Sequence, residues 1–187
     1  MPIKKIVITG PESTGKSTLC AQLAAHYKTA WCPEYAREYL LTYGKNYSFD
    51  DLLAIARGQL ALEDEYTKEL EQRAASSQQA LPLFIDTDMY VMKVWGEFVF
   101  GKNHRYVLQQ IVQRQYDLYL LCNIDLPWTP DELREHPDPE PRKQLYAMYR
   151  DLLINQHVPW TVISGNEEER LQQAIAATDL MLQNPDK

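Results

Sequence analysis

The residues GPESTGKS at positions 10–17 have the types and spacing of a loop that binds phosphate. They match the pattern G-x-x-x-x-G-K-[ST], with Gly10, Gly15, Lys16 and Ser17 at its specified positions. Glycines let backbone N–H groups close around phosphate oxygens, the lysine neutralises the β- and γ-phosphates, and the serine hydroxyl binds Mg²⁺. The residues expected to hold a nucleoside triphosphate are Gly10, Glu12, Ser13, Thr14, Gly15, Lys16, Ser17 and Thr18.

The segments on either side of this phosphate-binding loop (residues 10–17) are those that such a loop needs. Residues 3–9 read as a short apolar and β-branched strand. Residues 18–27 place Leu19, Leu23 and Tyr27 on one face, which predicts a helix whose N-terminal dipole favours an anion. A glycine turn before an ordinary amphipathic helix is the alternative, but the order strand, loop, helix favours the phosphate site.

The composition is that of one globular domain, so we expect residues 1–187 to fold as a single unit. A net charge of −7 argues against broad binding to nucleic acid or to anionic membranes, and the expected partner is a small molecule. There is neither a signal-peptide pattern nor an apolar run of bilayer length, so we expect the chain to be cytoplasmic. Three cysteines without C-x-x-C spacing predict buried thiols. Nothing in the sequence indicates an oligomeric state.

Strand-like and helix-like segments alternate along the rest of the chain. The further strands are expected at 29–32, 81–86, 116–125 and 159–164. The further helices are expected at 33–44, 50–73, 87–101, 104–115, 142–156 and 166–182. Together with the first strand, this alternation predicts an α/β fold of the P-loop NTPase class, with a five-stranded parallel sheet and helices on both faces.

Polar side chains follow the second and third expected strands, and ligands of open α/β sheets bind beyond the carboxyl ends of strands. Asp86 follows four apolar residues, the pattern of an acid that holds Mg²⁺. Asp88 is expected either to contact a substrate or to cap the next helix. Glu34 and Arg37 share one face of a predicted helix start. We expect Glu34 to orient an attacking hydroxyl and Arg37 to bind phosphate, with a surface ion pair as the alternative.

Residues 127–142 break the alternation, because they hold five of the eleven prolines among charged side chains. We interpret them as a mobile lid segment that closes over a phosphoryl-transfer site and excludes water. Arg134, preferred over Arg142, is expected to stabilise charge on the transferred phosphoryl group. A solvated charged loop is the alternative interpretation.

Two tryptophans and the turn after the last strand complete the set of candidate site residues. Trp128 in the lid segment and Trp95 in the helix before it are candidates to stack on a planar ring of a substrate. Gly165 and Asn166 follow the fifth strand, where a nucleotide base is expected. The residues do not decide between ATP and GTP as the nucleotide.

Six segments together resemble the kinase domain of the NadR family. They are GPESTGKSTL, PEYAREYL, FIDTD, the helix with Trp95, YDLYLLCNIDLPWTPDELREHP and VISG, in the same order along essentially the whole chain. The resemblance implies a P-loop kinase with sheet order 2-3-1-4-5 that phosphorylates the 5′-hydroxyl of nicotinamide riboside with ATP and Mg²⁺, giving nicotinamide mononucleotide in NAD salvage.

The same resemblance assigns roles to single residues. Lys16, Glu34, Asp86 and Arg134 would act in catalysis, with Ser17 and Asp86 on the metal. The riboside would lie beside Glu34, Arg37 and Asp88, with either Trp95 or Trp128 against the nicotinamide or another base.

The chain also departs from the longer members of that family. It shows no helix-turn-helix before the first strand and no [HT]-x-G-H adenylyltransferase signature, so we expect neither gene repression nor dinucleotide synthesis. A regulatory P-loop NTPase or GTP-binding switch without an acceptor is the alternative function. A carboxylate and an arginine facing the γ-phosphate favour the kinase, because a switch needs no acceptor pocket.

Overall fold

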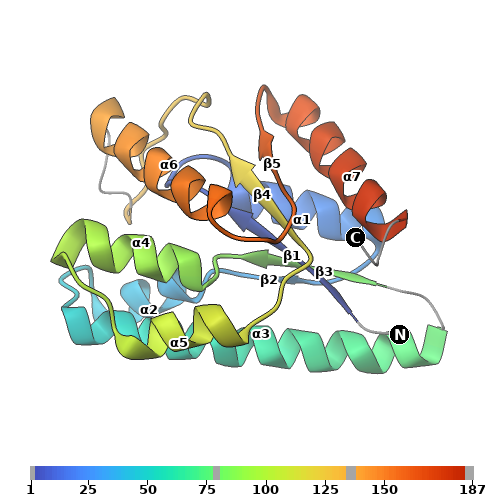
Figure 1. Cartoon of the computed structure of the whole chain (residues 1–187), viewed down its shortest axis with the longest axis horizontal. Helices are drawn as coiled ribbons and strands as arrows, with labels where there is room; N and C mark the ends of the chain where they lie inside the picture. The colour runs from blue at the N-terminus through green and yellow to red at the C-terminus, as the bar shows by residue number, and fades with distance from the viewer. Residues whose placement is uncertain (1–2, 78–80, 134–137, 184–187) are drawn as a thin grey trace.

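The protein is described here from a computed structural model, which covers residues 3–77, 81–133 and 138–183. Five parallel strands form one sheet, and helices pack against it on both sides (Figure 1). The strands are β1 (Lys4–Thr9), β2 (Trp31–Cys32), β3 (Pro82–Asp86), β4 (Leu118–Cys122) and β5 (Trp160–Ile163). Their order, β2-β3-β1-β4-β5, confirms the predicted one.

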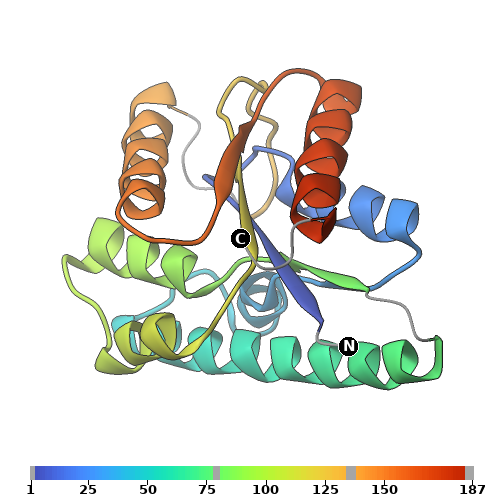
Figure 2. The same ribbon diagram turned by 45° about the vertical axis from the view of Figure 1, so that its right-hand side comes forward.

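Seven helices are described, and they divide between the two faces of the sheet. They are α1 (Lys16–Tyr27), α2 (Tyr35–Tyr43), α3 (Phe49–Ser77), α4 (Met89–Phe100), α5 (Arg105–Gln113), α6 (Pro139–Ile154) and α7 (Glu167–Gln183). Helices α1 and α7 cover one face, and α3, α4 and α6 cover the other (Figure 2). Helices α2 and α5 pack on α3 and α4 through a further apolar cluster.

The strands are apolar on both sides because both faces of the sheet are covered. In β1, Ile6 and Ile8 point toward α1 and α7, while Val7 points toward the opposite layer, and all three are fully buried. This burial holds the central strand rigidly and places its carboxyl end, where the phosphate-binding loop begins, in the middle of the sheet. All three cysteines are free and buried, as predicted.

The C-terminal boundary that the sequence predicted for the lid segment is wrong. Helix α6 begins at Pro139, because prolines at the first positions of a helix have the required backbone angle and need no hydrogen-bond partner. Arg142 therefore lies inside a helix and is buried, with its guanidinium donating to the backbone carbonyls of Ser13 and Leu126. Arg134 falls outside the described residues. None of the described helices is both long enough and apolar enough to cross a membrane.

Candidate nucleotide and acceptor site

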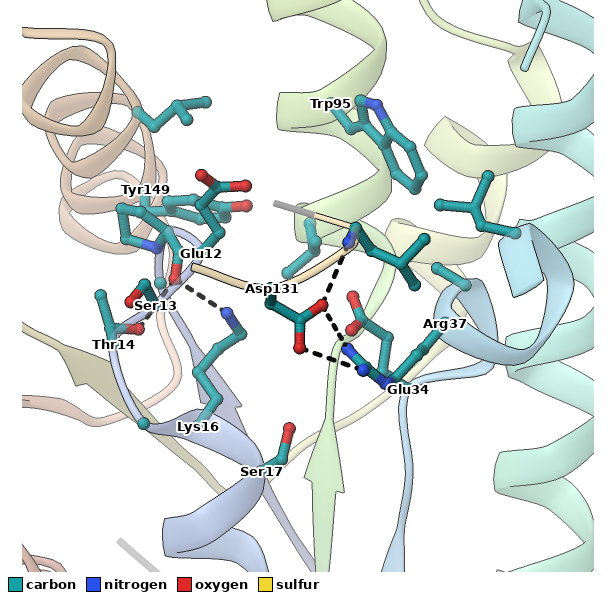
Figure 3. A pocket seen from close by; sticks show the side chains of 18 of the residues that line it. Glu12, Ser13, Thr14, Lys16, Ser17, Glu34, Arg37, Trp95, Asp131 and Tyr149 are labelled. Carbon is teal, nitrogen blue, oxygen red and sulfur yellow. Dashed lines mark hydrogen bonds and ion pairs between the residues drawn. The ribbon is translucent and has the colours of Figure 1, made fainter. Parts of the chain in front are cut away.

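A pocket of about 280 Å³ lies beyond the carboxyl ends of β1, β2 and β3 (Figure 3). The phosphate-binding loop forms one side, and α2, α4 and α6 contribute the others. The pocket includes the sequence-predicted residues of the loop together with Glu34, Arg37 and Trp95. Positions far apart in the chain are therefore neighbours around one cavity.

Glycines give the phosphate-binding loop its shape. Gly10 has a φ of 137°, and a Cβ there would lie 2.8 Å from the carbonyl oxygen of Cys122, so no other residue fits without displacing β4. Gly15 has a φ of 78° and precedes the first turn of α1. The Nζ of Lys16 and the hydroxyl of Thr14 both donate to the carbonyl of Pro11, each over 2.8 Å. Lys16 thus already reaches across the loop in which phosphate oxygens would lie.

Asp86, at the end of β3, is the carboxylate nearest to the loop serine. The Ser17 hydroxyl donates to its Oδ2 over 2.5 Å, and Asp86 is fully buried. Burial and the carboxylate of Glu34 raise the pKa of Asp86 to about 6, while Lys16 and the Ser17 hydrogen bond act to lower it. Its Oδ1 is buried and has no hydrogen-bond partner among the described residues. A buried carboxylate oxygen of this kind is suited to a cation.

Oxygen donors of this type fit Mg²⁺, which binds through one or two protein groups and completes its shell with waters and phosphate oxygens. Ser17, which lines the pocket, and Asp86, which is buried behind it and accepts its hydroxyl, supply such oxygens. Among the described residues there is no cluster of three or more metal-ligating side chains. The donor set therefore suits a cation that arrives with a nucleotide better than a cation held by protein alone.

Glu34 extends from the turn between β2 and α2 toward the pocket (Figure 3). The hydroxyl of Thr87 donates to its Oε1 over 3.4 Å, a long hydrogen bond. Thr87 has a φ of 83°, which is rare for a β-branched residue and marks strain between Asp86 and the start of α4. Thr87 was not predicted, because the sequence shows only an ordinary threonine between two acids.

Arg37 lies on the same wall and forms a bidentate ion pair with Asp131. Its two terminal nitrogens are each 3.1 Å from a carboxylate oxygen of Asp131 (Figure 3). The partner was not predicted, and it comes from the part of the lid segment that the structure describes. The pair connects α2 with the lid segment across the mouth of the pocket, so Arg37 is not a bare phosphate-binding cation in this structure.

The lid segment also contacts the phosphate-binding loop directly. The indole N–H of Trp128 donates to Glu12 over 3.2 Å, and the backbone N–H of Thr129 donates to the Ser13 hydroxyl over 3.0 Å. Trp128 therefore turns toward the loop and is not part of the pocket wall. The Glu12 carboxylate is therefore turned toward the lid segment.

Trp95 lines the apolar end of the pocket. Its indole N–H donates to the Tyr47 hydroxyl over 2.9 Å, and the two rings meet edge to face with centroids 4.9 Å apart. Val91, Phe98 and other apolar side chains extend this wall. Of the two tryptophans predicted as ring-stacking candidates, the structure places Trp95 in the pocket.

Asp88 has the role that the sequence left as the alternative. It caps α4, accepting from the backbone N–H groups of Tyr90 and Val91 over 3.1 and 3.3 Å. The Tyr119 hydroxyl donates to its second oxygen over 2.9 Å. Burial raises the pKa of Asp88 to about 7, against the lowering effect of these hydrogen bonds. Asp88 is not among the pocket-lining residues, so it supports α4 and not the cavity surface.

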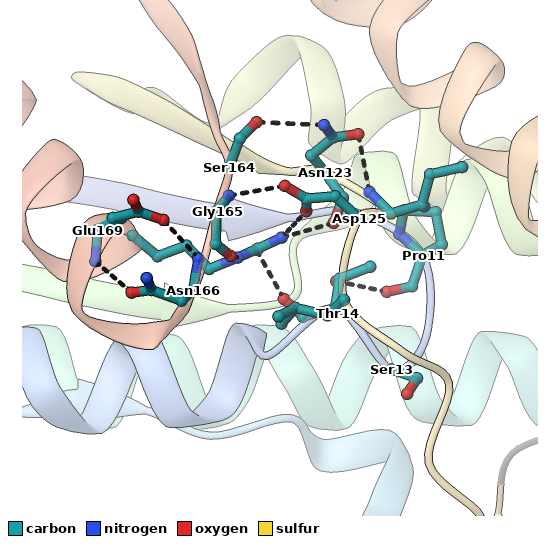
Figure 4. Close-up of polar contacts among 12 residues, drawn as sticks. Pro11, Ser13, Thr14, Asn123, Asp125, Ser164, Gly165, Asn166 and Glu169 are labelled. Carbon is teal, nitrogen blue, oxygen red and sulfur yellow. Dashed lines mark hydrogen bonds and ion pairs between the residues drawn. The ribbon is translucent and has the colours of Figure 1, made fainter.

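The turn after β5 lies beside Asn123 and Asp125 (Figure 4), and its residues do not line the pocket. The backbone N–H of Gly165 donates to Asp125 over 2.6 Å, and Asn166 pairs with Glu169 to begin α7. Arg170 joins this turn to the loop, because its buried guanidinium donates to backbone carbonyls on both. Gly165 and Asn166 therefore do not share the cavity with Glu34.

The sheet order, the glycine loop and the Ser17–Asp86 pair define a P-loop nucleotide-binding domain with the fold of P-loop kinases. The chain belongs to the family described as AAA domain, which matches residues 5–170.

Two curated relatives carry the same name, trifunctional NAD biosynthesis/regulator protein NadR. The Escherichia coli protein is 28% identical over 171 residues, which cover 89% of this chain and 39% of the relative. The Salmonella typhimurium protein is 26% identical over 162 residues, covering 83% and 37%. This chain thus spans about two fifths of the length of these relatives. The resemblance to the NadR family, predicted from the six motifs, is confirmed.

Solved structures show the same fold. A crystal structure of NadR protein in complex with NR superposes with a TM-score of 0.76 at 22% identity, covering 96% of this chain and 49% of that one. Thymidylate kinase from Ehrlichia chaffeensis superposes with a TM-score of 0.62 at 13% identity, covering 94% and 99%. Both matches extend over nearly all of this chain.

Proposed function

We propose that this protein is an ATP-dependent kinase that phosphorylates the 5′-hydroxyl of a nucleoside, with nicotinamide riboside as the first candidate. The observation that carries the proposal is a single cavity in which the phosphate-binding loop faces Glu34 and the apolar wall around Trp95. The names of the relatives support the substrate, because the curated ones are NAD biosynthesis proteins and a structurally similar NadR protein was solved in complex with NR. The product would be nicotinamide mononucleotide.

At the donor end, Lys16 and the loop N–H groups bind the β- and γ-phosphates of ATP. Ser17 and Asp86 would hold Mg²⁺, which would neutralise charge on the phosphate oxygens. The unpartnered Oδ1 of Asp86 supports this assignment, since cation binding would satisfy a buried oxygen. GTP remains a second donor to test.

At the acceptor end, Glu34 accepts a hydrogen bond from the nucleoside hydroxyl and holds its oxygen toward the γ-phosphate. Strong base catalysis is not required, because the transition state of phosphoryl transfer is loose and positioning dominates the rate. The Trp95 wall takes the planar base of the nucleoside, which aromatic side chains stack on well. The lid segment excludes water through its contacts with Glu12, Ser13 and Arg37.

Replacing Glu34 by glutamine tests the acceptor assignment. Glu34→Gln keeps the shape of the side chain and removes its charge, so we expect nucleoside-dependent turnover to fall on the order of 100-fold while ATP affinity stays within a few-fold. Glu38→Gln is the matched control, since Glu38 is exposed on the same helix and does not line the pocket. Equal losses of turnover and ATP affinity, or no loss in either, would contradict the assignment.

A further inference from the structure

Beneath the turn that carries Glu34 lies the fully buried amide of Gln59, on helix α3. Its Oε1 accepts from the backbone N–H of Tyr35 over 2.7 Å, and its Nε2 donates to the carbonyl of Pro33 over 3.2 Å. The amide also contacts the Sγ of Cys32 at 3.5 Å. One side chain therefore binds the backbone immediately before and immediately after Glu34.

Because of these bonds, the Glu34 side chain does not have to cap helix α2. Glu34 occupies the N-cap position of α2, in which a side chain commonly accepts from a free N–H group of the first turn. Its carboxylate makes no such capping bond. Gln59 accepts from the first-turn N–H of Tyr35 in its place. The Glu34 carboxylate thereby stays available for the pocket.

The residue before Gln59 shapes the same contact. A Cβ at Gly58 would lie 2.0 Å from Cε1 of Tyr35, so the tyrosine ring rests directly on the backbone of α3. Glycine is unfavourable in a helix interior, and the packing of this ring explains its presence. Gly58 and Gln59 together form the surface on which the turn lies.

The helix that presents this surface is itself held firmly. One turn beyond Gln59, the buried carboxylate of Glu63 accepts from Lys5 of β1 over 2.8 Å and from the Tyr116 hydroxyl over 2.9 Å. These bonds tie α3 to the central strand and to the segment before β4. Gln59 therefore projects from a rigid element, as a residue that positions another must.

We propose that Gln59 is a positioning residue for Glu34, which sets the carboxylate toward the phosphate-binding loop by fixing the backbone on both sides of it. The inference rests on the proposed kinase function. Among the described residues, the hydrogen bond that orients this carboxylate is the long one from Thr87 over 3.4 Å, so its direction depends mainly on the backbone. Displacing a reacting group by about 1 Å can lower a rate on the order of 100-fold.

Gln59→Leu removes both hydrogen bonds with little change in volume. We expect kcat for the nucleoside to fall roughly 10- to 100-fold while the Kd for ATP stays within a few-fold. In a Glu34→Gln background the same substitution should lower kcat by less than about twofold, because the effects of residues that act as one unit are not additive. Leu70→Ala is the control for lost stability, since Leu70 is buried on the same helix and does not line the pocket.

Unchanged kcat in Gln59→Leu, or an equal fold loss with and without Glu34, would overturn the inference and leave the kinase function standing. If Gln59→Leu does not fold, Gly58→Ala provides the second test, because alanine favours the helix but displaces the Tyr35 ring. Its kcat should fall, and a wild-type kcat would overturn the inference. If nucleosides do not change the rate at which the wild-type protein consumes ATP, the proposed kinase function is overturned, and this inference with it.

Discussion

Arg170 joins three loops at the edge of the site, so its removal gives a sharp test of how the phosphate-binding loop is supported. Its side chain is about 5% exposed and donates to the carbonyls of Gly165, Thr14 and Asn123 over 2.8, 3.1 and 3.0 Å. It also forms an ion pair with Asp125. Arg170→Met keeps most of the apolar stem and deletes all of these bonds.

The loss of stability expected for Arg170→Met follows from the burial of Arg170 and of Asp125. Breaking a buried ion pair by removing one member costs about 3–5 kcal/mol. The Asp125 side chain is 33% exposed, so water can hydrate it, and we take the lower end, about 3 kcal/mol. For a domain of this size that corresponds to a fall in Tm of about 6–12 °C. Arg170→Lys should not restore the Tm, because one ammonium group cannot reach acceptors on three loops.

Thermal denaturation with and without ATP and Mg²⁺ measures both the Tm of the ligand-free protein and its increase on ATP binding. Because Thr14 belongs to the phosphate-binding loop, we expect the stabilisation by ATP to shrink together with the Tm. Arg150→Met is the control, since Arg150 is exposed on α6. A Tm for Arg170→Met within about 1 °C of wild type, equivalent to well under 1 kcal/mol, would refute the structural role. A changed preference between ATP and GTP at unchanged Tm would point instead to contact with the base.

Two further predictions concern carboxylates that line the pocket or lie buried beside it. Asp131→Asn should change the Tm little, because half-exposed ion pairs contribute about 0.2–1 kcal/mol. It should raise ATP hydrolysis relative to phosphoryl transfer, because the lid segment loses its ion pair with Arg37. Glu132→Gln is the adjacent control, and equal ratios of hydrolysis to transfer in the two variants would contradict the role of the lid segment. The pKa of Asp86 rises on folding from 3.8 to about 6, so the folded protein holds this carboxyl group protonated more readily than the unfolded chain does. The stability that this group contributes to the ligand-free protein is therefore fully present below pH 4 and is lost as the pH rises through 6. Asp86→Asn should therefore raise the Tm at pH 8 and flatten the part of the decline that lies between pH 4 and pH 6. Asp88, whose pKa is about 7, should contribute a further decline at higher pH. Melting curves with the same pH dependence as wild type would refute this.

The parts of the site that the sequence predicted are those set by local patterns. The glycine spacing of the phosphate-binding loop and the acid at the end of an apolar strand each belong to one short segment. Glu34 was predicted because parallel strands bring their carboxyl ends to one edge of the sheet. The strand order was implied by the resemblance, and the structure confirms it.

The residues that were missed act through contacts between distant segments. Gln59 is 24 positions from its partner Tyr35, and Asp131 is 94 positions from Arg37. No spacing rule connects such pairs, and a glutamine inside a long polar helix resembles its solvated neighbours. Arg142 was assigned to the lid segment because prolines were taken as loop formers, whereas here they begin a helix.

The reaction that we propose is transfer of the γ-phosphoryl group of ATP, held by the phosphate-binding loop, to a nucleoside. The most direct measurement is ATP consumption by the wild-type protein with nicotinamide riboside, with other nucleosides and with no acceptor, with the phosphorylated product identified by mass. We predict that nicotinamide riboside gives the fastest rate and that the product gains one phosphate. ATP hydrolysis that is fastest without any acceptor would contradict the kinase function and favour a nucleotide-dependent switch.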